Sequence, residues 1–152
     1  HLTTLFPQVR LKKYLEIRSM DACSWDQICA QPAFWTGLLY DQDSLDEIYS
    51  IIKEWDSNDR DYLYKNVPKY GLNTKFKKGT ILDLAKKVLK ISLSGLKKRN
   101  CISSNNENDE RQYLQSVEEN LEKGLSPADI LIDKYLNKWN KNLLPIYEEN
   151  IF

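Results

Sequence analysis

The sequence predicts an α+β chain that is mostly α-helical, with one β-strand segment near its start. Two patterns support this prediction: polar and apolar residues alternate strictly over residues 9–18, and apolar residues recur at helical spacing afterwards. The chain has 152 residues, with only five Gly and five Pro to interrupt helices. This length supports one domain with a hydrophobic core. Because no repeat or internal linker is visible, we expect one unit, with a strand segment over 1–21 and a helical region over 22–152.

The predicted strand has two chemically different faces, because successive side chains of a strand point to opposite sides. Apart from Lys13, one face is aliphatic and carries Val9, Leu11, Leu15 and Ile17. The other face is polar and carries Gln8, Arg10, Lys12, Tyr14, Glu16 and Arg18. A single strand cannot pair its own backbone groups. We therefore expect its partners to come from outside this sequence, in a larger antiparallel sheet.

Helix signals fill the rest of the chain. Ser24 followed by Gln27 is typical of a capping box. This pair predicts a helix to about Ala30, which Pro32 interrupts before a short buried helix over 33–40. Capping residues and apolar spacing predict five further helices. They run from Ser44 to about Trp55, from Ser57 to about Val67, from Thr80 to about Lys98, from Glu110 to about Lys123 and from Ser126 to about Asn140. Loops are predicted over 69–79 and 103–109.

Charge and composition exclude some classes of function. The 22 basic and 22 acidic residues cancel, whereas a nucleic-acid-binding protein usually carries a basic excess, so no nucleic-acid partner is expected. No apolar run approaches the ~20 residues of a membrane-spanning helix, so no membrane association is expected. Three cysteines without a CxxC pair fit a reducing compartment. Because no secretory signal is visible, we expect a cytoplasmic protein.

The polar face of the strand carries the clearest chemical signal. Arg10, Lys12, Glu16 and Arg18 project to one side, about 7 Å apart at every second residue. A carboxylate among cations suits a nucleotide triphosphate with its divalent metal, because carboxylate oxygens bind Mg²⁺ and arginines bind phosphate. The alternative is a solvent-exposed antiparallel strand with cross-strand ion pairs. The spacing by itself favours this alternative.

Two longer motifs favour the nucleotide–metal site over the solvent-exposed strand. The N-terminal stretch HLTTLFPQVRLKKYLEIR (1–18) closely resembles a segment of the glutamate–cysteine ligases of plants and many proteobacteria. The resemblance continues in PAFWTGLLYD (32–41), with weaker similarity as far as LPIYEE (144–149). It implies that residues 1–152 are the C-terminal part of the catalytic domain, in a fold like that of glutamine synthetase with a curved antiparallel sheet.

The resemblance also implies a reaction and a set of site residues. The family joins glutamate to cysteine with ATP, giving gamma-glutamylcysteine, the first step of glutathione synthesis. Glu16-Ile17-Arg18 resembles the family's Glu-x-Arg element, which implies that Glu16 binds Mg²⁺ and that Arg18 is catalytic and binds glutamate or the transferred phosphoryl group. Arg10 and Lys12 are expected to contact ATP or substrate, on the basis of their position on the same face.

These expectations make the chain one part of a larger enzyme. Its partners would be the small molecules glutamate, cysteine and ATP and the missing N-terminal part of the same enzyme, so we expect the isolated chain to be inactive. A plastid location is the alternative to the cytoplasm if a transit peptide has been removed. Two other functions remain open: a related carboxylate–amine ligase of the ergothioneine pathway, and a non-catalytic helical interaction module.

Overall fold

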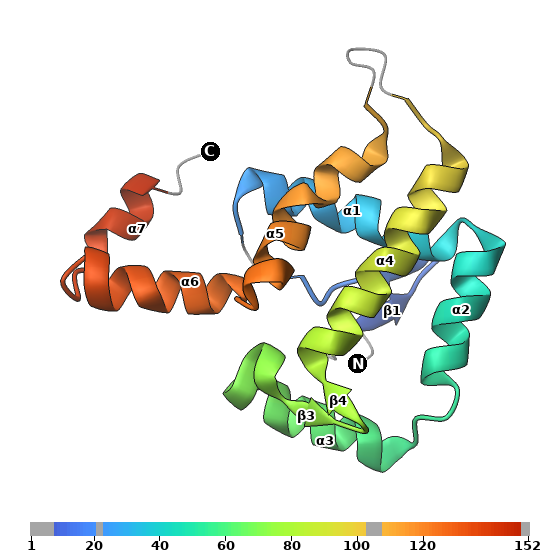
Figure 1. The fold of residues 1–152 in the computed structure, drawn as a ribbon, viewed down its shortest axis with the longest axis horizontal. Coiled ribbons are helices and arrows are strands. Elements are labelled where there is room, and N and C mark those ends of the chain that lie inside the picture. Colours follow the sequence, from blue (N-terminus) through green and yellow to red (C-terminus); the bar gives the residue numbers. More distant parts are fainter. Residues whose placement is uncertain (1–7, 21–22, 103–107, 150–152) are drawn as a thin grey trace.

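The computed structural model describes residues 8–20, 23–102 and 108–149. The first seven residues of the N-terminal motif and most of the predicted loop over 103–109 therefore lie outside the described residues. The described chain is mostly helical with a small amount of antiparallel sheet, which confirms the predicted α+β class (Figure 1). Its longer helices are α1 (Trp25–Leu39), α2 (Gln42–Ile52), α3 (Ser57–Tyr70), α4 (Ile81–Arg99) and α5 (Gln115–Lys123).

The N-terminal segment is a β-hairpin, so the prediction of one continuous strand was wrong. Strand β1 (Val9–Leu11) pairs antiparallel with β2 (Leu15–Ile17), and the backbone N–H of Lys12 donates to the carbonyl of Tyr14 in the turn. The strands therefore pair with each other within this chain, contrary to the expectation that their partners must come from outside. The alternation concealed the turn because a three-residue turn leaves the parity of the second strand unchanged.

Helix α1 is continuous through Pro32, so the predicted break at this residue was also wrong. Proline removes one backbone hydrogen bond, yet the helix packs over its length and buries Ala30, Ala33 and Leu38. Tertiary packing thus outweighs the local cost of the proline. Ser24 does precede the helix, but its side chain makes no capping hydrogen bond, so the predicted capping box is absent.

The next two helices begin with aspartates that the sequence analysis did not select. The Asp41 side chain caps α2 by accepting a hydrogen bond from the Ser44 backbone N–H at 2.9 Å, and Asp56 caps α3. Helix α3 continues through Pro68 to Tyr70. The predicted loop over 69–79 also contains regular structure: a 3₁₀ turn, η2 (Gly71–Asn73), and a small hairpin of β3 (Lys75–Phe76) and β4 (Gly79–Thr80).

Capping signals in the second half were accurate. Thr80 and Asp83 form the predicted capping box of α4, and Gly124 ends α5 in a left-handed conformation with φ 68°. Ser126 caps α6 (Pro127–Asp133) as predicted. A five-residue 3₁₀ helix, η3 (Glu110–Leu114), precedes α5, and a short π-helix, η4 (Lys134–Lys138), and α7 (Leu144–Glu149) follow α6. The sequence analysis did not predict α7.

The hydrophobic core lies where α1 crosses α4, with η3 and α5 packed against both helices (Figure 1). Its buried residues are Ala30, Ala33, Leu89, Leu96, Leu114 and Leu121. The two helix backbones approach closely at Gly37 and Gly95, and the Ser92 hydroxyl donates a 2.8 Å hydrogen bond to the carbonyl of Phe34 across the contact. This close contact lies at the centre of the helical region.

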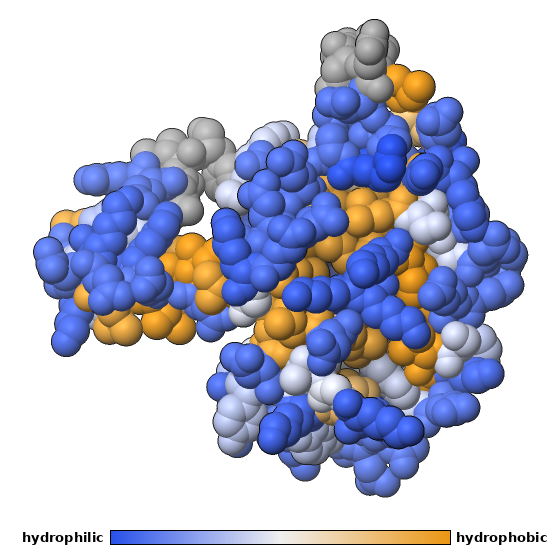
Figure 2. Space-filling model, in the orientation of Figure 1, coloured by the Kyte–Doolittle hydropathy of each residue, from blue (hydrophilic) through white to orange (hydrophobic). Residues whose placement is uncertain are grey.

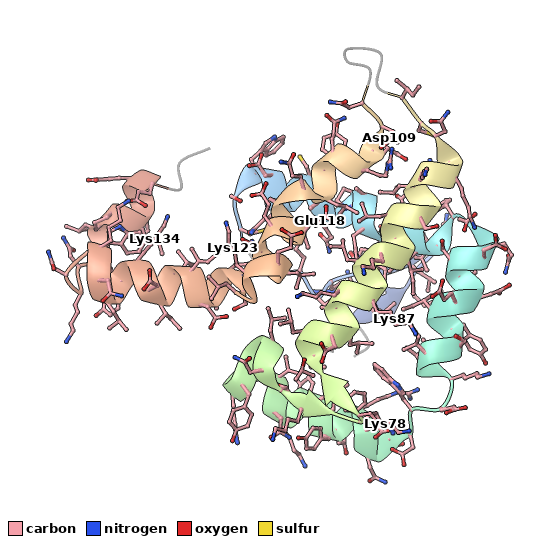
Figure 3. The ribbon with its side chains drawn as sticks, in the orientation of Figure 1. Lys78, Lys87, Asp109, Glu118, Lys123 and Lys134 are labelled. Carbon is pink, nitrogen blue, oxygen red and sulfur yellow. The ribbon has the colours of Figure 1, made fainter. Side chains whose placement is uncertain are left out.

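A helical arm extends away from this core. It consists of α6, η4 and α7, and it projects to one side of the helical body (Figure 1). Glu149 closes the arm by accepting hydrogen bonds from Lys138 Nζ at 2.7 Å, Trp139 Nε1 at 3.0 Å and Lys134 Nζ at 3.0 Å. Lys134 is labelled on this arm in Figure 3. Apolar surface is visible on the arm as well as beside α4 (Figure 2).

Candidate functional site

The hairpin brings the predicted site residues together. In the register of the two strands, Arg10 lies directly opposite Glu16, on the face opposite to the pairs Val9–Ile17 and Leu11–Leu15. Directly opposed side chains of antiparallel strands point the same way, and their Cβ atoms lie about 5 Å apart. Arg10 Nε accordingly donates a 2.7 Å hydrogen bond to Glu16 Oε2.

Lys12 and Arg18 complete a cluster around the same carboxylate. Lys12 Nζ is 3.5 Å from Glu16 Oε1, and Arg18 Nη1 is 3.7 Å from Glu16 Oε2. We call these four residues, Arg10, Lys12, Glu16 and Arg18, the polar face of the hairpin. Glu16 and Arg18 thus lie on the same side of the segment, as the alternation predicted.

The polar face is an electropositive surface with one acid at its centre. Three cations surround the single carboxylate, which leaves a net charge of two positive units. The hydrogen bond from Arg10, followed by the positive charges of Arg10 and Lys12, lowers the pKa of Glu16 below its usual value. Glu16 is therefore ionised at neutral pH. The side chains of Arg10, Glu16 and Arg18 are about one-quarter exposed, and that of Lys12 is more exposed.

This arrangement also contains the cross-strand ion pair of the alternative interpretation. The pair between Arg10 and Glu16 forms within the chain and satisfies the carboxylate without any ligand. These four residues nevertheless carry more positive than negative charge, because they contain three cations and one carboxylate. An ion-paired resting state and an anion-binding surface are thus compatible in the same four residues.

The donor set fits a metal–phosphate ligand only in part. Mg²⁺ is often held by one or two protein carboxylates together with substrate phosphates and water, so Glu16 can supply one ligand. Among the described residues, no group of three or more His, Cys, Asp or Glu side chains is placed to hold a metal ion. The phosphate oxygens would bind to the surrounding cations, for which arginine guanidinium groups are well suited.

A concave region that the sequence analysis did not anticipate lies outside the hairpin. It has a volume of about 390 Å³ and lies between α1 and the η3–α5 segment, with Trp25, Cys29, Tyr113 and Ser116 in its lining. The Ser116 hydroxyl oxygen is buried without a hydrogen-bond partner. The lining residues are far apart in the sequence and follow no motif, so only the packing of the helices could reveal this hollow.

Comparison with known proteins identifies the family. The model of glutamate-cysteine ligase family 2 (GCS2) matches residues 1–149. The match covers almost the entire chain, including the hairpin and the helical region. The chain therefore belongs to glutamate-cysteine ligase family 2, as the resemblance of the two N-terminal motifs implied.

Individual relatives agree with this assignment. The chain is 40% identical over all of its 152 residues to glutamate–cysteine ligase A, chloroplastic, of Oryza sativa subsp. indica, and it covers 30% of that protein. It is also 40% identical over its full length to the chloroplastic glutamate–cysteine ligases of Solanum lycopersicum and Arabidopsis thaliana, and covers 28% of each. The chain thus spans less than one-third of the length of these curated relatives.

The names of these relatives place them in the chloroplast. Within residues 8–20, 23–102 and 108–149, no helix combines the length and apolar character needed to cross a bilayer.

Proposed function

We propose that this chain forms part of the active site of an ATP-dependent ligase that joins the side-chain carboxylate of glutamate to the amine of cysteine. Membership of the ligase family supports the reaction, and the polar face of the hairpin supports the location of the site. The observation that carries the proposal is the convergence of Arg10, Lys12 and Arg18 on Glu16 at the place where the family resemblance is strongest.

In this proposal Glu16 would hold a metal ion in place of one of its cationic partners. Its low pKa keeps it charged, which is the state required of a carboxylate ligand. Bound Mg²⁺ would offset the negative charge of the ATP phosphates and of the transferred phosphoryl group. Because Mg²⁺ commonly takes only one or two protein carboxylates, a second acidic residue would come from the part of the enzyme outside these 152 residues.

The three cations would hold the anionic reactants. Arg18 directly follows β2, on the same side of the segment as Glu16, and its planar guanidinium could bind a carboxylate or phosphoryl group through two parallel hydrogen bonds. Arg10 would become available to an anion if Glu16 held the metal, and Lys12 would provide a further positive charge at the turn. Each cation would position charged oxygens and stabilise the charge that develops during transfer.

The reaction explains why positive charge is needed. In this reaction ATP transfers its terminal phosphoryl group to the side-chain carboxylate of glutamate, giving an acyl phosphate and ADP. The cysteine amine then attacks the acyl carbon and expels phosphate. Both steps gather negative charge on oxygens, and no protein nucleophile is required. The polar face contains no serine, cysteine or histidine, and its charged groups suit this kind of electrostatic catalysis.

A chimeric enzyme tests the proposal. The region of the rice ligase that aligns with this chain is replaced by residues 1–152, and gamma-glutamylcysteine formation is measured with ATP, Mg²⁺, glutamate and cysteine. We expect Glu16→Gln to lower kcat/KM by about 100-fold or more, because an amide is a poor metal ligand. The matched control is Glu122→Gln at an exposed position of α5, which should leave activity unchanged.

The result that contradicts the proposal is an active Glu16→Gln chimera. A second measurement uses the 152-residue chain alone, for which we expect no ligase turnover and no tight, Mg²⁺-dependent binding of ATP by calorimetry. Tight binding by the isolated chain would show that its site is complete without the remainder of the enzyme.

We also propose that the ligase acts in the cytoplasm or, as the names of the relatives favour, inside a plastid. Microscopy of the full coding sequence fused to a fluorescent protein distinguishes the two compartments.

A further inference from the structure

The side of the hairpin opposite to the candidate site is an exposed aliphatic surface. We call Val9, Leu11, Leu15 and Ile17 the aliphatic face. The two cross-strand pairs Val9–Ile17 and Leu11–Leu15 place these side chains on one side, away from the polar face. Leu11 is 79% exposed, Leu15 68% and Val9 51%. This hairpin therefore exposes most of its aliphatic face to solvent, whereas its polar face is partly covered.

This distribution is unusual for an antiparallel sheet. Such sheets commonly bury the apolar face against a core and leave the polar face in water. In addition, a two-stranded hairpin is only marginally stable when nothing packs on it. Within the described residues, β1 and β2 contact each other extensively but neither makes a comparable contact with any helix of this chain.

The length of the relatives indicates what covers this face. Proteins 40% identical to this chain contain its equivalent within chains more than three times as long. The polar face also supplies only one carboxylate, so the site proposed above needs groups from that remaining length. The first requirement is met if one part of that remaining length packs against the back of the hairpin, and the second if another part reaches the polar face.

We infer that the aliphatic face is the docking surface by which this region joins the rest of the ligase, through an apolar layer on that part of the enzyme. This inference rests on the proposed function and names the partner of the same site. Docking behind the strands fixes the direction of the polar face, because side chains on the two faces share one backbone. Leu11 and Leu15 are accordingly positioning residues: they act through the orientation of Glu16 and touch no substrate.

Hydrogen exchange measured by mass spectrometry tests the inference on two proteins, the 152-residue chain and the rice chimera. We expect the backbone amides of β1 and β2 to exchange at least about 10-fold more slowly in the chimera, because docking suppresses local opening. The double substitution Leu11→Ser and Leu15→Ser should remove this protection, and Leu11→Met with Leu15→Met should retain it. The control is Ile102→Ser, at an aliphatic position that is 59% exposed and distant in sequence from the hairpin.

Three results would overturn the inference. The first is equal exchange of the hairpin amides in the chain and in the chimera. The second is protection that survives the double serine substitution. The third is a dimer of the 152-residue chain, detected by sedimentation, that the serine substitutions dissociate, since the occupant would then be a second copy.

The same samples separate this inference from the proposed function. If Glu16→Gln leaves the chimera active while hairpin protection still depends on Leu11 and Leu15, docking stands and the catalytic role fails. If Glu16→Gln removes activity while the hairpin exchanges freely, the catalytic role stands and docking fails.

Discussion

The close contact between α1 and α4 makes a sharp prediction about Gly95. A Cβ atom added at this position would lie 2.0 Å from the carbonyl oxygen of Gly37 and 2.8 Å from the Ser44 hydroxyl. The first distance is 1.4 Å short of the 3.4 Å at which ordinary contact begins. Gly95→Ala therefore requires the two helix backbones to move apart at the centre of the core.

Two opposing effects determine the size of the change. Over-packing of this severity belongs near the upper end of its usual range, about 3 kcal/mol. Replacing glycine by alanine inside a helix gains about 1 kcal/mol from helix propensity. We expect a net loss of about 2 kcal/mol in the free energy of unfolding, which is a large share of the roughly 5–15 kcal/mol of a typical domain.

Urea denaturation followed by far-UV circular dichroism measures this loss. The control is Ser94→Ala, at the adjacent exposed position of α4, where helix propensity alone should raise stability by roughly 0.5 kcal/mol. The test is that the two neighbouring substitutions change the free energy of unfolding in opposite directions. A Gly95→Ala protein that is as stable as the wild type or more stable would refute the described crossing of α1 and α4.

Two further predictions concern charged side chains. Three hydrogen bonds lower the pKa of Glu149 to about 2. The stability that these bonds contribute is therefore complete above the ordinary pKa of the carboxyl group, near 4.5, and is lost as the pH falls from there through about 2. The indole N–H resonance of Trp139 should report this loss, and Glu149→Gln should give the low-pH resonance already at neutral pH. Asp41→Ala removes the cap of α2 and should cost about 1 kcal/mol in urea denaturation, whereas Asp43→Ala, at a side chain 82% exposed, should cost much less. Equal losses at Asp41 and Asp43 would argue against the capping role.

Local chemical signals at helix ends predicted the second half of the chain better than the first, where Ser24 makes no capping hydrogen bond and α2 and α3 are capped by Asp41 and Asp56. The Thr80–Asp83 capping box and the left-handed Gly124 depend on a few adjacent residues, and both were predicted correctly. Pro32 was misleading because it lies within α1, whose packing against the core compensates for one lost backbone hydrogen bond. Pro68 was misleading as well, because α3 continues through it to Tyr70, although this helix buries none of its residues. Whether a helix continues through a proline cannot be deduced from the neighbouring residues in the sequence.

In the candidate site too, the sequence predicted some features, whereas others became visible only in the structure. Alternation correctly placed Arg10, Lys12, Glu16 and Arg18 on one side, because side-chain parity survives the turn. It could not show that the chain reverses at Lys12, and so it could not show that Arg10 lies opposite Glu16 at hydrogen-bond distance. The roles of these residues depended on the resemblance to a family, because a row of alternating charges is equally typical of ion pairs on a sheet surface.

We propose that Glu16 leaves its ion pair with Arg10 to bind the metal of a nucleotide complex. A crystal structure of the rice chimera with Mn²⁺ and a non-hydrolysable ATP analogue tests this directly, because anomalous scattering locates the metal. We predict a Glu16 oxygen at about 2 Å from the metal, a typical carboxylate–metal distance, with the Arg10 guanidinium bound to phosphate oxygens. A metal bound elsewhere, with the 2.7 Å contact between Arg10 and Glu16 intact, would contradict the claim.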